Sequence, residues 1–273
     1  RIELYVYMAE ESDWEPLKQF LKTHTPPQVN ITLDAEYPVV TAEKGYGSIK
    51  LTLPPRTALP ASGGPVLKSL KGGFFASQIP EDATAVIEHA PAALEAAIRA
   101  RAQRQQGMCY SYARDGGTLT VAALGVSAHS SKPEDGVNAI GMLADALAVQ
   151  PWRGTQAADM LSFLNELVGT GIYGERFGQI AYRDGFMGPM TVAPTVLKQQ
   201  RGELELNINV RRPQGKTAAV RVRAFTVSGV ASAAVGAARG YIFAPAMNAL
   251  SIVESVSFSS VPIPLSVQED GKK

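Results

Sequence analysis

The chain has 273 residues, of which 45% are hydrophobic and 19% charged, and its formal net charge is +1. This composition is typical of a globular protein with a substantial core. The sequence lacks the dense stripe of Lys and Arg that would indicate nucleic-acid binding. It also has no apolar run long enough to cross a membrane. The single cysteine, Cys109, excludes a disulfide framework and favours a reducing compartment, so we expect a cytoplasmic protein.

The N-terminal part of the chain predicts strands around one helix. Residues 2–8 have the apolar character of a strand, and a helix with one apolar face is predicted over 13–24. Residues 31–45 resemble a strand, a polar loop and another strand, and 46–53 alternate as a strand does. The Pro- and Gly-rich stretch 54–65 indicates a domain boundary. Because the chain opens within a strand, with neither an initiator methionine nor a secretory signal, we expect a truncated protein.

The middle of the chain alternates strand-like and helix-like segments. They are a strand (83–89), a helix (90–107), a hairpin turning at Asp115-Gly116-Gly117 (108–128), two helices (136–149 and 155–169) and a second hairpin (190–213). This order predicts an antiparallel sheet covered by helices on one face, an α/β sandwich. The pattern "GMCYSYA" predicts a buried, inert Cys109.

The C-terminal part is rich in Ala, Val, Ser and Gly, and between residues 224 and 268 it carries only two charged residues, Arg239 and Glu254. It could pack as irregular strands or form a foreign or poorly ordered tail. We therefore divide the chain into residues 1–55, 56–217 and 218–273.

Two acidic motifs are candidates for metal chemistry. Glu10 and Glu11 follow the first predicted strand, where one carboxylate could bind a cation while the other takes a proton from water. An acidic helix start is the structural alternative, since carboxylates suit the helix dipole. Asp34, in "LDAEYP", could be another metal ligand or could form an Asx turn.

Two further motifs carry polar side chains at strand ends. His129, in "GVSAHSSKPEDG", could donate a hydrogen bond to a developing oxyanion or belong to a simple polar loop. Arg211, just before Arg212 and Pro213, could bind a carboxylate with its guanidinium or be a surface arginine. His24 and His89 have no clear partners, and we expect both to be structural or surface residues.

Taken in order, several of these stretches resemble one family. They are "YMAEESDW", "LDAEYPVVTAEKG", "GGFFASQIPEDATAVI", "GVSAHSSKPEDGVNAIGMLADAL" and "LNINVRRPQGKT". They are similar to the di-zinc metallopeptidases of the aminoacylase and carboxypeptidase-G family, and most to the bacterial dipeptidases of the PepV, or carnosinase-like, type. The resemblance covers about residues 1–217. It implies part of a zinc-peptidase-type α/β catalytic domain in residues 1–55 and an α/β-sandwich, ferredoxin-like lid domain in 56–217.

The resemblance also implies roles for single residues. Glu10 matches the general base. Glu11 and Asp34 match ligands of the two zinc ions, and His129 matches the lid histidine that stabilises the oxyanion. A substrate would be a dipeptide or short peptide. Two positions would hold it: Arg211, which matches the arginine that binds the terminal carboxylate, and Ser77, which stands where this branch usually has Asn. A homodimer through the lid domain is a further expectation.

The sequence departs from the family pattern at its metal site. The His-x-Asp motif and the bridging Asp that precede the first strand in the family are absent, and no His follows His129. Residue 9 is Ala where an acidic residue is common. Three interpretations follow: part of a zinc dipeptidase, a non-catalytic relative that serves as a lid, self-association or peptide-binding module, or an active site completed by another polypeptide.

Overall fold

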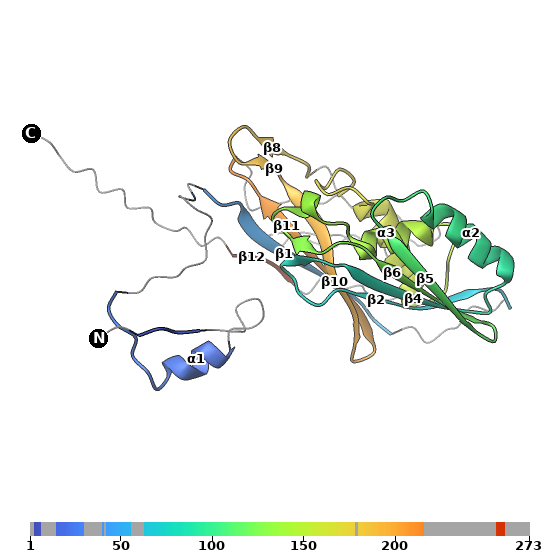
Figure 1. Cartoon of the computed structure of the whole chain (residues 1–273), viewed down its shortest axis with the longest axis horizontal. Helices are drawn as coiled ribbons and strands as arrows, with labels where there is room; N and C mark the ends of the chain where they lie inside the picture. Colours follow the sequence, from blue (N-terminus) through green and yellow to red (C-terminus); the bar gives the residue numbers. More distant parts are fainter. Residues whose placement is uncertain are drawn as a thin grey trace, which may run out of the picture.

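An eight-stranded antiparallel sheet organises the described part of the chain, with helices on one face, so the protein is α/β as the sequence predicts (Figure 1). The computed structural model describes residues 3–6, 15–29, 40, 42–55, 63–177 and 180–215, and the backbone of 255–259. The strand order is β12-β1-β11-β10-β2-β4-β6-β5.

The main strands have the following bounds: β1 Gly45–Leu53, β2 Val66–Gly72, β4 Asp82–Glu88, β5 Cys109–Asp115, β6 Thr118–Leu124, β10 Thr191–Gln200, β11 Glu203–Arg212 and β12 Ser255–Ser259. Two-residue strands form the small pairs β3 (Gln78–Ile79) with β7 (Ala128–His129) and β8 (Arg183–Asp184) with β9 (Gly188–Pro189). The helices are α1 Glu15–Leu21, α2 Ala92–Ala102, α3 Ala139–Ala146 and α4 Gln156–Phe163, with a 3-10 turn, η1, at Pro133–Asp135 and a π-helical turn, η2, at Leu164–Val168.

Both predicted hairpins are confirmed, because their turns are set by local chemistry. In the β5–β6 hairpin Asp115 pairs with Thr118, and Gly116 has a φ of 53°. In the β10–β11 hairpin the two turn residues, Arg201 and Gly202, have φ values of 51° and 84°. Positive φ at the central residues gives a two-residue turn the twist that antiparallel strands need.

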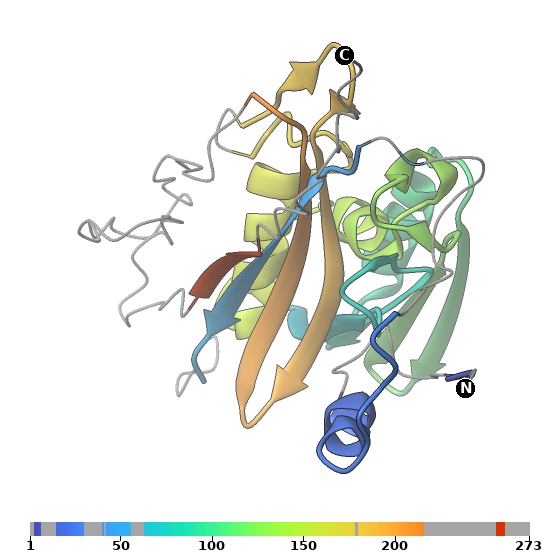
Figure 2. The same cartoon turned by 90° about the vertical axis from the view of Figure 1, so that its left-hand side faces the viewer.

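The helices bury one face of the sheet. Alternate residues of β4 are buried, as expected for a strand with one covered face. Figure 2 shows the orange strands β10 and β11 in front of the yellow and green helices. The largest fully buried side chains of this core include Ile49, Leu119, Ile98, Leu143 and Met160.

The sheet has a seam between β10 and β2, which are joined in register at Leu197 and Gly72. Each of these strands has a register shift close to the seam, between Pro194 and Val196 in β10 and between Leu67 and Ser69 in β2. Such bulges bend a strand and leave backbone groups outside the ladder. These groups find side-chain partners: Asn138 Nδ2 donates to Pro194 O at 2.8 Å, and Thr155 Oγ1 donates to Leu67 O at 2.7 Å.

The two side chains that reach the bulges are also helix N-caps. Asn138 Oδ1 accepts a hydrogen bond from Gly141 N at 3.1 Å at the start of α3, and Thr155 Oγ1 accepts one from Ala158 N at 3.0 Å at the start of α4. Each helix start is therefore tied to one bulge by a single side chain. This arrangement fixes α3 and α4 on the sheet at its seam.

Strand β1 extends this sheet from within the first predicted domain. It pairs with β11 along its whole length, from Gly45 with Arg212 to Leu53 with Leu204, and on its other side with β12. The strand predicted over 46–53 is thus confirmed. Whether residues 1–55 and 56–217 form separate domains stays a prediction.

Three sequence expectations near the N-terminus and the sheet edge are wrong. Residues 3–6, within the strand predicted over 2–8, form no strand. Cys109 is exposed because β5 is an edge strand, where an alternating pattern does not ensure cover. His24 has partners: its Nε2 lies 2.9 Å from Glu3 Oε2 and 2.8 Å from the Tyr5 hydroxyl.

Helix α1 confirms the helix predicted over 13–24 within its described residues, but it buries no side chain. It lies away from the sheet in Figure 1. In the described part of the chain, no helix has both the length and the apolar character needed to cross a membrane.

Ile49→Ala should destabilise the protein by about 2–5 kcal/mol, because Ile49 on β1 is buried in the hydrophobic core and its truncation leaves a cavity. Urea unfolding of the chain would measure the change. Lys68→Ala is the control, because the Lys68–Glu88 ion pair is exposed and should contribute less than about 1 kcal/mol. Equal stability of Ile49→Ala and the unchanged chain would show that β1 is no integral part of the core.

Candidate functional site

The short β3–β7 pair brings two predicted site residues side by side. Gln78 and His129 are register partners, and the backbone N–H of Ser130 donates to the carbonyl of Ser77 at 2.7 Å. Ser77 and His129 therefore occupy one small layer at the end of the sheet, although 52 residues separate them in the sequence. Whether these two residues share a functional site stays a prediction.

Arg211 reaches the same layer from β11. Its Nη2 donates to the hydroxyl of Ser130 at 3.2 Å, and its guanidinium lies 5.1 Å from the ring centroid of Tyr46 on the neighbouring strand. Arg211 is 8% exposed, so its charge is held in a largely dehydrated position. Thr191, the register partner of Arg211 on β10, donates its hydroxyl to the Ser130 carbonyl at 3.4 Å. We call Ser77, His129, Ser130 and Arg211 the corner.

Asn209 on β11 holds the chain segment that leads into the corner. It lies two residues before Arg211, so both side chains leave β11 on the same face. Its Nδ2 donates to the carbonyl of Ala76 at 2.9 Å, next to Ser77. Asn209 is 1% exposed, and its Oδ1 is buried without a hydrogen-bond partner among the described residues. One face of β11 thus holds both chain segments that form the corner.

The ring of His129 is exposed and oriented by its neighbour. Its Nδ1 lies 2.6 Å from the hydroxyl of Ser131 and accepts a long hydrogen bond, 3.4 Å, from the Ser131 backbone N–H. Because Nδ1 acts as an acceptor, a neutral ring carries its proton on Nε2. That Nε2–H can donate to an oxygen atom of a bound molecule.

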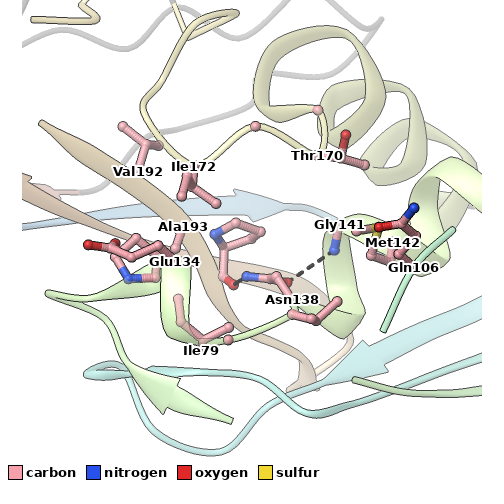
Figure 3. Close-up of a pocket in the computed structure, with 16 residues that line it drawn as sticks. Ile79, Gln106, Glu134, Asn138, Gly141, Met142, Thr170, Ile172, Val192 and Ala193 are labelled. Atoms are coloured by element: carbon pink, nitrogen blue, oxygen red, sulfur yellow. Dashed lines mark hydrogen bonds between the residues drawn. The ribbon is translucent and has the colours of Figure 1, made fainter. Parts of the chain in front are cut away.

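A cavity of about 290 Å³ is lined by residues of α3, β10 and the segments next to them. Figure 3 shows its lining side chains around Asn138, whose Oδ1 accepts from Gly141, with Glu134 at one side and Gln106 and Met142 at the other. Its other lining residues are Ile79, Pro133, Gly136, Val137, Gly169, Thr170, Gly171, Ile172, Val192, Ala193 and Pro194. The cavity is apolar with few polar groups, a composition that suits a small ligand. None of the corner residues lines it.

Charged groups gather between the cavity and the start of β1. Burial lowers the pKa of Lys44 from its usual value, the nearby Glu134 carboxylate opposes this change, and the like charge of Arg183 adds to it. Lys44 directly precedes β1, whose first residue pairs with Arg212. Lys44 therefore lies within electrostatic reach of both an acidic and a basic side chain.

One predicted general base and two predicted metal ligands belong to parts of the chain that the structure does not describe. Glu10, Glu11 and Asp34 lie outside the described residues. Within the described ranges, no group of three or more His, Cys, Asp or Glu side chains could hold a metal ion. A structural zinc site commonly needs four protein donors and a catalytic one three. The described residues alone therefore do not form such a site.

Sequence reasoning missed the residues that hold the corner together. Ser130, Asn209 and Asn138 were not singled out, although each is a polar side chain in an otherwise predicted element. For Asn209 a signal existed, because the spacing of two from Arg211 places both on one face of a strand. For Ser130 and Asn138 the partners lie on β10 and β11, more than 50 residues away in the sequence.

Comparison with known proteins yields similarity to dipeptidases. No family model matches the chain. It is 27% identical over 224 residues to "Putative dipeptidase YtjP" of Bacillus subtilis (78% of this chain, 46% of that protein). It is also 27% identical over 218 residues to the "Beta-Ala-Xaa dipeptidase" of Lactobacillus delbrueckii subsp. lactis (79% and 45%). The chain spans about half the length of these curated relatives.

Asn138→Ala should destabilise the protein by about 2–4 kcal/mol, because it removes the cap of α3 and leaves the Pro194 carbonyl without its donor. Asn138→Asp separates the two effects. It keeps an acceptor for Gly141 but cannot donate to Pro194, so it should also destabilise the protein. Thermal and urea unfolding would measure both variants. If Asn138→Asp were as stable as the unchanged chain, the bond to the bulge would contribute nothing.

Proposed function

We propose that the chain is part of a zinc-dependent dipeptidase that hydrolyses dipeptides or short peptides. One observation carries the proposal: His129 and Arg211, which their own sequence positions suggested, and Ser77, which the family resemblance added, meet through Ser130 in one corner. The similarity to proteins named as dipeptidases agrees with this combination. Peptide hydrolysis is the activity that these groups suit best.

Three of the four corner residues have a part in substrate binding. Arg211 binds the carboxylate at the C-terminus of the peptide, because a buried guanidinium forms strong, directional bonds with a carboxylate. His129 donates its Nε2–H to the carbonyl oxygen of the scissile amide as negative charge develops on it. Ser77 contacts the peptide backbone between them.

The metal site of this proposal rests on residues outside the described ranges. Glu11 and Asp34 would hold the zinc ions, and further donors would come from elsewhere. When bound, zinc would supply an acidified water. Glu10 would act as the general base.

A second candidate function needs no metal. The corner is built wholly from described residues, so the chain could bind peptides without hydrolysing them or serve as a self-association module. A homodimer through residues 56–217 stays a prediction, as does the absence of nucleic-acid and membrane partners. We also propose a cytoplasmic location, where a reducing environment would keep the exposed Cys109 thiol free.

Arg211→Met should weaken binding of the dipeptide Gly-Phe by about ten- to a hundredfold, the value of a hydrogen bond to a charged group. Binding of Gly-Phe amide should change little, because the amide has no carboxylate for Arg211 to bind. Calorimetric titration would measure both ligands. Arg99→Met is the matched control, since Arg99 lies on α2 over the ring of Tyr112. Arg211→Lys keeps the charge but loses the paired N–H donors of the guanidinium. This variant replaces Arg211→Met in the same titrations if the Met variant unfolds. Equal losses for the two ligands would contradict the assignment of Arg211.

Glu10→Gln should abolish dipeptide hydrolysis while leaving zinc bound, because the amide cannot take a proton from water. Elemental analysis of the purified chain and hydrolysis of a small dipeptide panel would measure the two properties separately. About two zinc ions per chain would agree with the proposed site. Loss of zinc in the variant would make Glu10 a ligand, and an unchanged chain with neither zinc nor turnover would favour the binding module.

A further inference from the structure

The loop that connects β2 with β3 displays two phenylalanine side chains to solvent. Phe74 is 81% exposed and Phe75 is 46% exposed. Neither belongs to the hydrophobic core. Single exposed apolar residues are ordinary, but two adjacent aromatic side chains next to a polar site indicate a contact surface.

The backbone of this loop is fixed at several points. Gly73 has a φ of 68°, and a Cβ atom there would lie 2.0 Å from the carbonyl oxygen of Thr195. At the other end, the carbonyl of Ala76 accepts from Asn209 at 2.9 Å and that of Ser77 accepts from Ser130 at 2.7 Å. The loop therefore presents Phe74 from a rigid backbone, which reduces the entropy lost when a ligand binds.

The same contacts place Phe74 beside the corner. Asn209 and Arg211 leave one face of β11, the first holding Ala76 and the second holding Ser130. Phe74 is two residues from Ala76, so the two Cα atoms are at most about 7 Å apart. Phe74 therefore belongs to the chain segment that Asn209 and Ser130 hold at the corner.

We propose that Phe74 determines the specificity of the site by packing against a large apolar or aromatic side chain of the peptide. This inference rests on the proposed function, and it names the substrate class: dipeptides that combine a free carboxylate with a bulky apolar residue. Contact between two aromatic rings adds to the gain from burying their surface. Phe75 borders the contact and is already half covered.

The test compares the binding of Gly-Phe and Gly-Gly by calorimetric titration. The unchanged chain should bind Gly-Phe more tightly. Phe74→Ala should weaken Gly-Phe binding by about tenfold, equivalent to part of one buried aromatic side chain, and leave Gly-Gly binding unchanged. Phe74→Leu should restore most of the loss. Leu124→Ala is the control, because Leu124 is a 54% exposed apolar residue on β6, away from this loop.

The outcomes separate the inference from the proposed function. If both dipeptides bind and Phe74→Ala leaves their ratio unchanged, the inference is wrong and the proposed function stands. If neither dipeptide binds to the unchanged chain, the proposed function fails and the inference with it. An unchanged ratio together with self-association that Phe74→Ala abolishes in sedimentation would instead assign Phe74 to contact between two copies of the chain.

Discussion

The hydrogen bonds of Asn138 are the contact on which the rest of the fold depends. One amide group caps α3 with its oxygen and holds the Pro194 carbonyl with its nitrogen. Pro194 lies at the bulge of β10, next to the seam where the two halves of the sheet meet. The bulge changes the register between β10 and β11. It therefore decides which residue of β10 faces Arg211. That residue is Thr191, whose hydroxyl reaches Ser130.

The same principle operates at the other helix. Thr155 caps α4 and holds the Leu67 carbonyl at the bulge of β2, while the next residue, Gln156, donates to the Leu53 carbonyl at the end of β1. A backbone carbonyl displaced from its ladder would be costly to bury without a donor. Capping residues that also serve the bulges remove this cost at both positions. Both bulges are thus accommodated without an unpaired backbone carbonyl at Pro194 or Leu67.

Sequence reasoning succeeded where structure is decided locally. Asp115, Gly116 and Gly117 specify their hairpin through turn chemistry, and the apolar periodicity of the helices specifies the face that they bury. It failed where distant segments decide. An alternating pattern placed Cys109 in the core, but the edge position of β5 leaves that side chain uncovered. The roles of Ser130 and Asn138 depend on the bulge in β10 and on β11, which no local pattern reveals. Among the corner residues, His129 and Arg211 were candidates from their own positions, whereas Ser77 was found only through the family resemblance.

Two side chains on one face of β11 have different roles at the corner. On one face of this strand, the Asn209 side chain binds the backbone of the loop at Ala76, whereas the Arg211 side chain contributes a positive charge to the corner. A dipeptide with an apolar residue carries two corresponding groups, a charged carboxylate at one end and an apolar side chain nearby. Polar groups give such a ligand its orientation, and apolar contact gives most of its affinity. Asn209 and Arg211 stand two residues apart on one strand, so the Phe74 loop and the charge of Arg211 are held by the same element. Under the proposed function, the preference among peptides would depend on the loop, because the sheet would fix only where the carboxylate binds.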